Sequence, residues 1–106
     1  MGDILISTSE TIDGKYPKKT LGLVRGNTIR ARWFGRDIAA SLKTLVGGEI
    51  KSYTKMLSDA RDEAIDRMVE HAKEKGANGI IGVRFTTSNV MQGAAEILVF
   101  GTAVVI

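Results

Sequence analysis

The chain has 106 residues, of which 43% are hydrophobic and 25% are charged; this is the composition of one small folded domain and not of a disordered segment. The sequence contains no cysteine, which excludes disulfide bonds, thiolate nucleophiles and thiolate metal ligands. The formal net charge is only +3, which by itself is a weak indication of nucleic-acid binding. We therefore treat residues 1–106 as a single domain.

The N-terminal segment does not resemble a signal peptide, because it has no basic stretch and its apolar run extends only from Ile4 to Ile6. No part of the chain reaches the roughly 20 consecutive apolar residues that a membrane-spanning helix needs. These two features predict a cytoplasmic protein without a membrane partner.

The first third of the chain predicts two strands. Ile4 to Ile6 is a short strand candidate, and the following segment, Glu10 to Lys19, contains the only proline and predicts a loop. Residues Thr20 to Ala31 are rich in β-branched and aliphatic side chains, which favours a second strand. Its internal glycines predict a bulge or tight turn near Gly26-Asn27.

Two helices are predicted in the middle of the chain. The first extends from about Phe34 or Arg36 to Val46, and Gly47-Gly48 is expected to end it. The second extends from Ser52 or Tyr53 to Lys75, with Gly76 as its C-terminal cap. Its apolar stripe is predicted to contain Met56, Leu57, Ala60, Ala64, Met68 and Ala72.

Two antiparallel strands are predicted at the end of the chain, Gly79 to Val90 and Ala95 to Ile106, joined by a hairpin loop over Met91 to Ala94. The helices are grouped in the middle of the chain and do not alternate with strands. This order predicts an α+β fold, a two-layer sandwich in which a small antiparallel sheet packs against two helices.

The last strand is apolar on both of its sides. Strand side chains alternate, so Leu98 and Phe100 are expected on one side and Ile97 and Val99 on the other. The helices can cover only one face of the sheet, and an apolar second face normally marks an interface. The sequence therefore predicts a closed homo-oligomer.

His71 is the only histidine, and Glu70 and Glu74 lie near it on the predicted helix. A transition-metal site usually recruits several His or Cys ligands, so His71 is a weak metal candidate. The alternative interpretation is a histidine at the margin of the apolar stripe. No cofactor is expected.

Three arginines, Arg30, Arg32 and Arg36, alternate with the aromatic residues Trp33 and Phe34. Such a cluster can bind anions or stack on nucleic-acid bases. The competing interpretation is that the aromatic residues are core or interface anchors and that the arginines are solvated or paired with acids. An anion- or nucleic-acid-binding module is thus the alternative function.

The segment between the two predicted helices is a candidate ligand or subunit contact. Ser52 can cap the second helix, Tyr53 begins its apolar stripe, and Glu49 has no evident structural role. Arg61 follows further along the helix and joins this set. Neither a phosphate-binding loop nor a catalytic set is recognisable, so the protein is not expected to be an enzyme.

Three segments begin with glycine: Gly47–Tyr53, Gly76–Arg84 and Gly101–Val105. In this order they resemble segments of the YbjQ-like family of small prokaryotic proteins, which carries the label of a heavy-metal-binding domain. The resemblance implies a dodecin-like β-α-β-β subunit that assembles into a pentameric ring, and it supplies no catalytic residues. Together these observations predict a non-enzymatic homo-oligomer that binds a small ligand or a heavy-metal ion in its ring.

Overall fold

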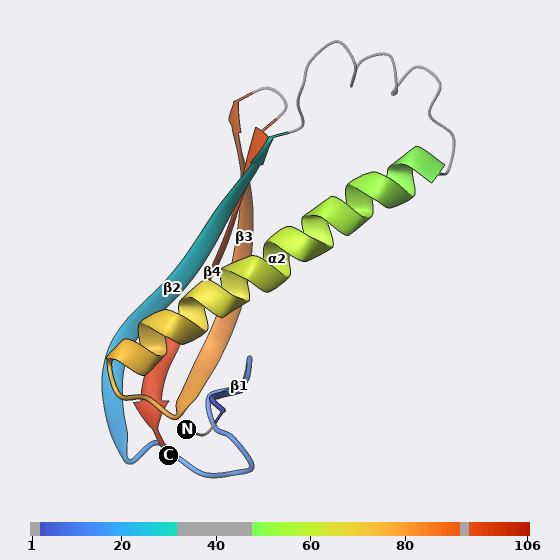
Figure 1. The fold of residues 1–106 in the computed structure, drawn as a ribbon. Coiled ribbons are helices and arrows are strands. Elements are labelled where there is room, and N and C mark those ends of the chain that lie inside the picture. Colours follow the sequence, from blue (N-terminus) through green and yellow to red (C-terminus); the bar gives the residue numbers. More distant parts are fainter. Residues whose placement is uncertain (1–2, 32–47, 92–93) are drawn as a thin grey trace.

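The computed structural model describes residues 3–31, 48–91 and 94–106, in which one long helix crosses one face of a four-stranded sheet (Figure 1). In chain order the elements are β1 (Leu5–Ile6), β2 (Lys19–Ala31), α2 (Gly48–Glu74), β3 (Gly79–Met91) and β4 (Ala94–Val105). This arrangement confirms the α+β class. The first predicted helix, residues 36–46, lies outside the described residues.

The sheet has the order β1-β3-β4-β2 and is mixed. β4 pairs antiparallel with both β3 and β2, as predicted for the C-terminal hairpin, whereas β1 pairs parallel with β3. The prediction of a purely antiparallel sheet was therefore wrong for β1. The parallel pair is only two residues long, Leu5 with Gly79 and Ile6 with Ile80, and the chain then crosses to the opposite edge to form β2.

β2 confirms the predicted second strand, but its irregularity lies elsewhere. The register shifts between Thr20 and Gly22, where Gly22 has a φ of 113°, and Gly26 is paired regularly with Val99. The prediction of a bulge near Gly26 was wrong, because this glycine serves the packing of the helix. A Cβ atom at Gly26 would lie 2.1 Å from the carbonyl oxygen of Ala64.

α2 begins at Gly48, several residues before the predicted start. The expected loop after Gly47-Gly48 and the N-cap role of Ser52 are therefore wrong, since Glu49, Ser52 and Tyr53 are all helical. The sequence offers a physical reason. Ile50, Tyr53 and Leu57 continue the three- and four-residue spacing of the apolar stripe. An acidic residue in the first turn, Glu49, interacts favourably with the helix dipole.

The core lies between α2 and the sheet. Small side chains dominate the buried stripe of the helix, so its backbone comes close to β2 and β4. The predicted stripe positions Ala60, Ala64, Met68 and Ala72 are all fully buried. The sheet contributes Val24, Ile80, Val83, Ile97, Val99 and Ala103.

The C-terminus of α2 follows the prediction closely. Gly76 has a φ of 83°, its N–H donates to the carbonyl of Lys73, and the N–H of Ala77 donates to the carbonyl of Ala72. This pattern of 3.0 and 3.1 Å bonds is a Schellman cap, which requires the left-handed conformation that glycine adopts most readily. Ala77 then packs against the core and directs the chain into β3.

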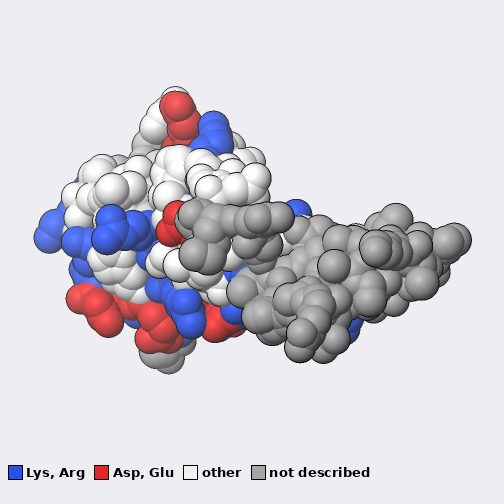
Figure 2. All heavy atoms as spheres, turned by 90° about the horizontal axis from the view of Figure 1, so that it is seen from above, with Lys and Arg blue, Asp and Glu red and all other residues white. Residues whose placement is uncertain are grey.

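Charged side chains of both signs are mixed over the described surface, and Figure 2 shows Lys and Arg beside Asp and Glu in place of one continuous basic face. Within the described ranges, no helix combines the length and the apolar character that crossing a bilayer requires.

Candidate functional site

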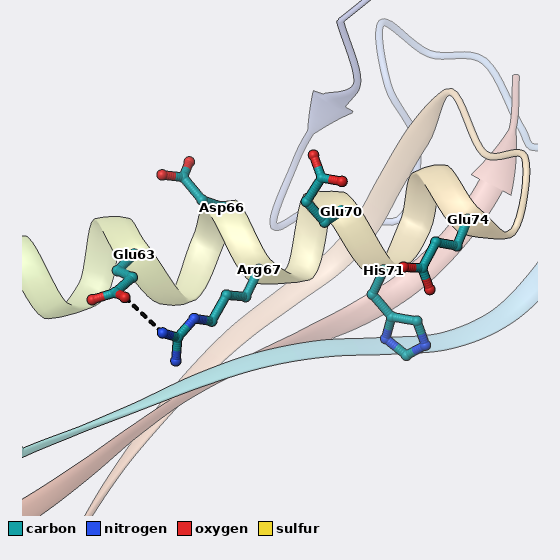
Figure 3. A pocket seen from close by; sticks show the side chains of 6 residues that line it. All are labelled: Glu63, Asp66, Arg67, Glu70, His71 and Glu74. Atoms are coloured by element: carbon teal, nitrogen blue, oxygen red, sulfur yellow. Dashed lines mark hydrogen bonds and ion pairs between the residues drawn. The ribbon is translucent and has the colours of Figure 1, made fainter.

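An open hollow of about 410 Å³ lies along the second half of α2 (Figure 3). Its lining comes entirely from the second half of α2, and four of its six residues are acidic. The lining residues are Glu63, Asp66, Arg67, Glu70, His71 and Glu74.

Glu63 is the centre of an ion-pair cluster. Its carboxylate accepts hydrogen bonds from Arg30 of β2 and from Arg67 of α2, the latter over 2.7 Å. The hydrogen bond from Arg30, assisted by the charges of both arginines, holds the pKa of the Glu63 carboxyl below its ordinary value, although burial acts in the opposite direction. The cluster joins α2 to β2 near the midpoint of the helix.

Arg67 and His71 reach the backbone of β2. The N–H of Arg25 donates to Nδ1 of His71 over 3.2 Å, and Nη1 of Arg67 donates to the carbonyl oxygen of Asn27 over 2.7 Å. Figure 3 shows both side chains extending from the same side of α2 over β2. His71 is half-buried, which matches the interpretation of a histidine at the margin of the apolar stripe.

The donor set of this groove does not fit a resident heavy-metal ion. A histidine that binds a metal through one nitrogen usually donates its other N–H to a carbonyl or carboxylate. Here Nδ1 of His71 accepts from Arg25, so the proton of the neutral ring is on Nε2, the only nitrogen that a metal could approach. In addition, Asp66 and Glu70 point away from the side on which His71 lies (Figure 3).

The remaining carboxylates do not supply a metal site either. Among the residues that the structure describes, no group of three or more His, Cys, Asp or Glu side chains is placed to share a metal ion. What the groove offers is an acidic surface beside two ordered side chains, Arg67 and His71.

The candidate contact residues predicted from the sequence are all on α2, and Arg61 is not among the residues that line the groove. Glu49, Ser52 and Tyr53 belong to its first two turns, and Arg61 is exposed further along the helix. Tyr53 and Arg61 are separated by about 12 Å along the axis, at 1.5 Å per residue, so the helix does not draw them into one compact site.

The predicted arginine cluster is only partly described. Arg30 donates to Glu63, in keeping with the interpretation of an arginine paired with a nearby acid. Arg32 and Arg36 lie outside the described residues.

Sequence reasoning missed the contact of Arg67 and His71 with β2. A signal was present, because Glu63, Arg67 and His71 follow one another at four-residue intervals and so share one side of a helix. The sequence could not show that this side faces the free edge of a strand.

The face of the sheet opposite α2 carries large apolar side chains among polar ones, since Arg25 and Asn27 are also exposed there and Nδ2 of Asn27 donates to Glu96 over 3.0 Å. Leu23 and Ile29 of β2 are 61% and 58% exposed, and both alternate with residues whose side chains are buried against the helix. Leu98 and Phe100 of β4 are only half-buried, while their neighbours Ile97 and Val99 are in the core. This difference confirms the two sides predicted for residues 97–100, whereas Ala103 and Val104 are both fully buried.

Comparison with known proteins places the chain in a family. The family model described as "Putative heavy-metal-binding" matches residues 4–106. The UPF0145 protein of Colwellia psychrerythraea is 55% identical over 101 residues, covering 95% of this chain and 96% of the relative. The UPF0145 protein of Halorubrum lacusprofundi is 58% identical over 99 residues, covering 93% and 95% of the two chains.

A solved structure shares the fold. A protein of unknown function of the DUF74 family from Pediococcus pentosaceus aligns with a TM-score of 0.66 at 21% identity, covering 97% of each chain. At this identity the likeness concerns the fold alone. The match of the family model over nearly the whole chain, together with relatives above 50% identity, shows that the chain belongs to the YbjQ-like family.

Proposed function

We propose that this protein is a non-enzymatic, cytoplasmic homo-oligomer whose subunits associate through the face of the sheet opposite α2, where Leu23 and Ile29 are exposed. The observation that carries the proposal is the exposure of Leu23 and Ile29 on the face opposite α2. Leaving such side chains in water forfeits about 1.5–3 kcal/mol of burial for each of them. Half-buried Leu98 and Phe100 extend the same face across β4.

The number of subunits that we propose is five, arranged in a closed ring. This number comes from the family resemblance, whereas the need for a partner comes from the sheet face. In such a ring, each copy places this face against a different surface of the next copy, and closure leaves no unpaired subunit at an end.

The ring is also the place that we propose for a small ligand. The family description extends the proposal to a heavy-metal ion, but the His71 geometry argues against one chain holding such an ion by itself. Donors from several copies would then have to converge.

Charge substitution on the sheet face tests the assembly. Leu23→Lys places an ammonium group in the proposed interface and should reduce the measured mass in light scattering, because a charge would have to lose its hydration there. Ser58→Lys, at an exposed position of α2, is the matched control and should keep the mass of the wild type.

Circular dichroism verifies that both variants are folded, and Ile29→Lys provides a second position on the same face. Wild-type mass in both folded sheet-face variants would contradict the proposal.

A further inference from the structure

We propose that His71 and Arg67 form a clasp that closes the middle of the β2 edge against strand addition by a second copy, and that this role prevents His71 from serving as a metal ligand. The part that concerns association rests on the proposed homo-oligomer. The part that concerns the histidine ring and the metal stands without it.

Among the strands in the described part of the chain, β2 is the outermost and pairs with β4 alone. In an antiparallel pair, alternate residues turn their N–H and C=O groups away from the partner strand. Arg25 and Asn27 are two such residues, because the N–H of Arg25 and the carbonyl of Asn27 bond to side chains of α2. Nδ1 of His71 thus accepts from the outward N–H of Arg25, and the guanidinium group of Arg67 donates to the outward carbonyl of Asn27.

The two clasp residues are held in place by further contacts between α2 and β2. Arg67 also bonds to Glu63 over 2.7 Å, and Glu63 bonds to Arg30 of β2. Beneath them, Oγ1 of the buried Thr28 donates to the carbonyl oxygen of Ala60 over 3.1 Å. The helix is therefore fixed along β2 on both sides of Asn27, and the clasp does not depend on one flexible side chain.

On the other side of the sheet, the N-terminal segment continues along β3 beyond the two-residue strand β1. The N–H groups of Gly82 and Val83 in β3 donate to the carbonyls of Ser9 and Ser7, over 2.9 and 3.1 Å. An unpaired strand edge is a template for uncontrolled pairing with other chains. The chain thus covers the middle of the β2 edge and the part of β3 beyond β1 with its own atoms. The sheet face around Leu23 stays open, which directs a second copy to that face.

The clasp determines the protonation of His71. Its Nδ1 must present a lone pair to Arg25, so the neutral ring carries its proton on Nε2. Coordination of a metal by Nε2 would require this proton to leave, and a proton moved to Nδ1 would face the N–H of Arg25. Metal binding by His71 and closure of the β2 edge therefore exclude each other.

Two measurements on the folded full-length chain test the clasp directly. Long-range ¹⁵N–¹H spectra of the neutral ring should show the proton of His71 on Nε2. In His71→Ala, amide exchange of Arg25 should become about five- to tenfold faster, the factor that a net hydrogen-bond contribution corresponds to. In His71→Asn, whose Oδ1 can replace Nδ1 as acceptor, exchange should stay close to the wild-type rate.

A proton on Nδ1, or equal Arg25 exchange in all three proteins, would overturn the clasp. Exchange protection in β4 serves as the internal reference that each variant is folded.

Addition of Zn²⁺ to the wild type tests the exclusion of metal. The ring signals of His71 should stay unchanged at one equivalent, and a stoichiometric shift of these signals would overturn this part of the proposal.

The effect on association is measured with the double variant Arg67→Ala/His71→Ala. Native mass spectrometry should show species larger than the wild-type assembly, because the opened edge can add strands. An unchanged mass distribution together with faster Arg25 exchange would contradict the directing role. If the wild type itself proves monomeric, the proposed function fails, while the ring tautomer and the Arg25 exchange still decide the clasp.

Discussion

Gly26 illustrates how a single residue sets the distance between layers. A Cβ atom there would lie 2.1 Å from the carbonyl oxygen of Ala64 and 2.5 Å from the backbone nitrogen of Met68. Backbone atoms of a helix cannot move aside locally as a flexible side chain does. From the sequence, this glycine predicted a bulge. The close approach of α2 could not be predicted, because a residue without a side chain does not indicate which element packs against it.

We expect Gly26→Ala to lower the free energy of unfolding by about 3 kcal/mol, since α2 would have to move away from β2. Arg25→Ala, at the neighbouring exposed position, should change it by no more than about 0.5 kcal/mol. Urea unfolding of both variants measures the difference, and equal stability of the two would contradict the close packing.

The ion pairs of Glu63 between α2 and β2 make the stability of the fold dependent on pH. The hydrogen bond from Arg30 holds the pKa of this carboxyl below its ordinary value of 4.5, so the folded state favours the charged form. The resulting stabilisation is fully present above the ordinary pKa and is lost as the pH falls through the lowered value of the folded state.

Between pH 7 and pH 3 the wild type should therefore lose more stability than Glu63→Gln, whose side chain does not titrate. Thermal unfolding across this range tests the expectation. Parallel curves for the two proteins would show that Glu63 is not linked to folding.

At the scale of elements, helix α2 and the C-terminal hairpin were predictable because their signals are local. Apolar residues at helical spacing indicated the buried stripe, and Gly76 indicated where the helix ends. The start of α2 was misjudged because two adjacent glycines, Gly47 and Gly48, predict an ending when only local preferences are considered. The parallel pairing of β1 had no local signal, since it joins Leu5 to Gly79 across most of the chain.

The Schellman cap provides a test of the helix end. Gly76→Ala forces a side chain into a positive φ and should lower the free energy of unfolding by about 1 kcal/mol. Lys75→Ala is the control, because Lys75 is exposed and precedes the left-handed position. Chemical denaturation with an unchanged midpoint for Gly76→Ala would contradict the cap.

At the scale of the whole molecule, the sequence predicted that one sheet face would lack a cover, and exposed Leu23 and Ile29 lie there. The alternation of side chains along β4 was sufficient for this prediction. The contacts between α2 and β2 could not be predicted from the sequence. Arg25 and His71 are distant in sequence and meet only because the helix lies diagonally over the edge strand (Figure 1).

We propose above all that the protein functions as a homo-oligomer joined through this sheet face. Light scattering coupled to size-exclusion chromatography of the wild type, at about micromolar concentration, tests it most directly. We predict one monodisperse species with five times the 11.4 kDa mass of the subunit. Another closed oligomer would correct only the number of subunits, whereas a stable monomer of 11.4 kDa would contradict the account.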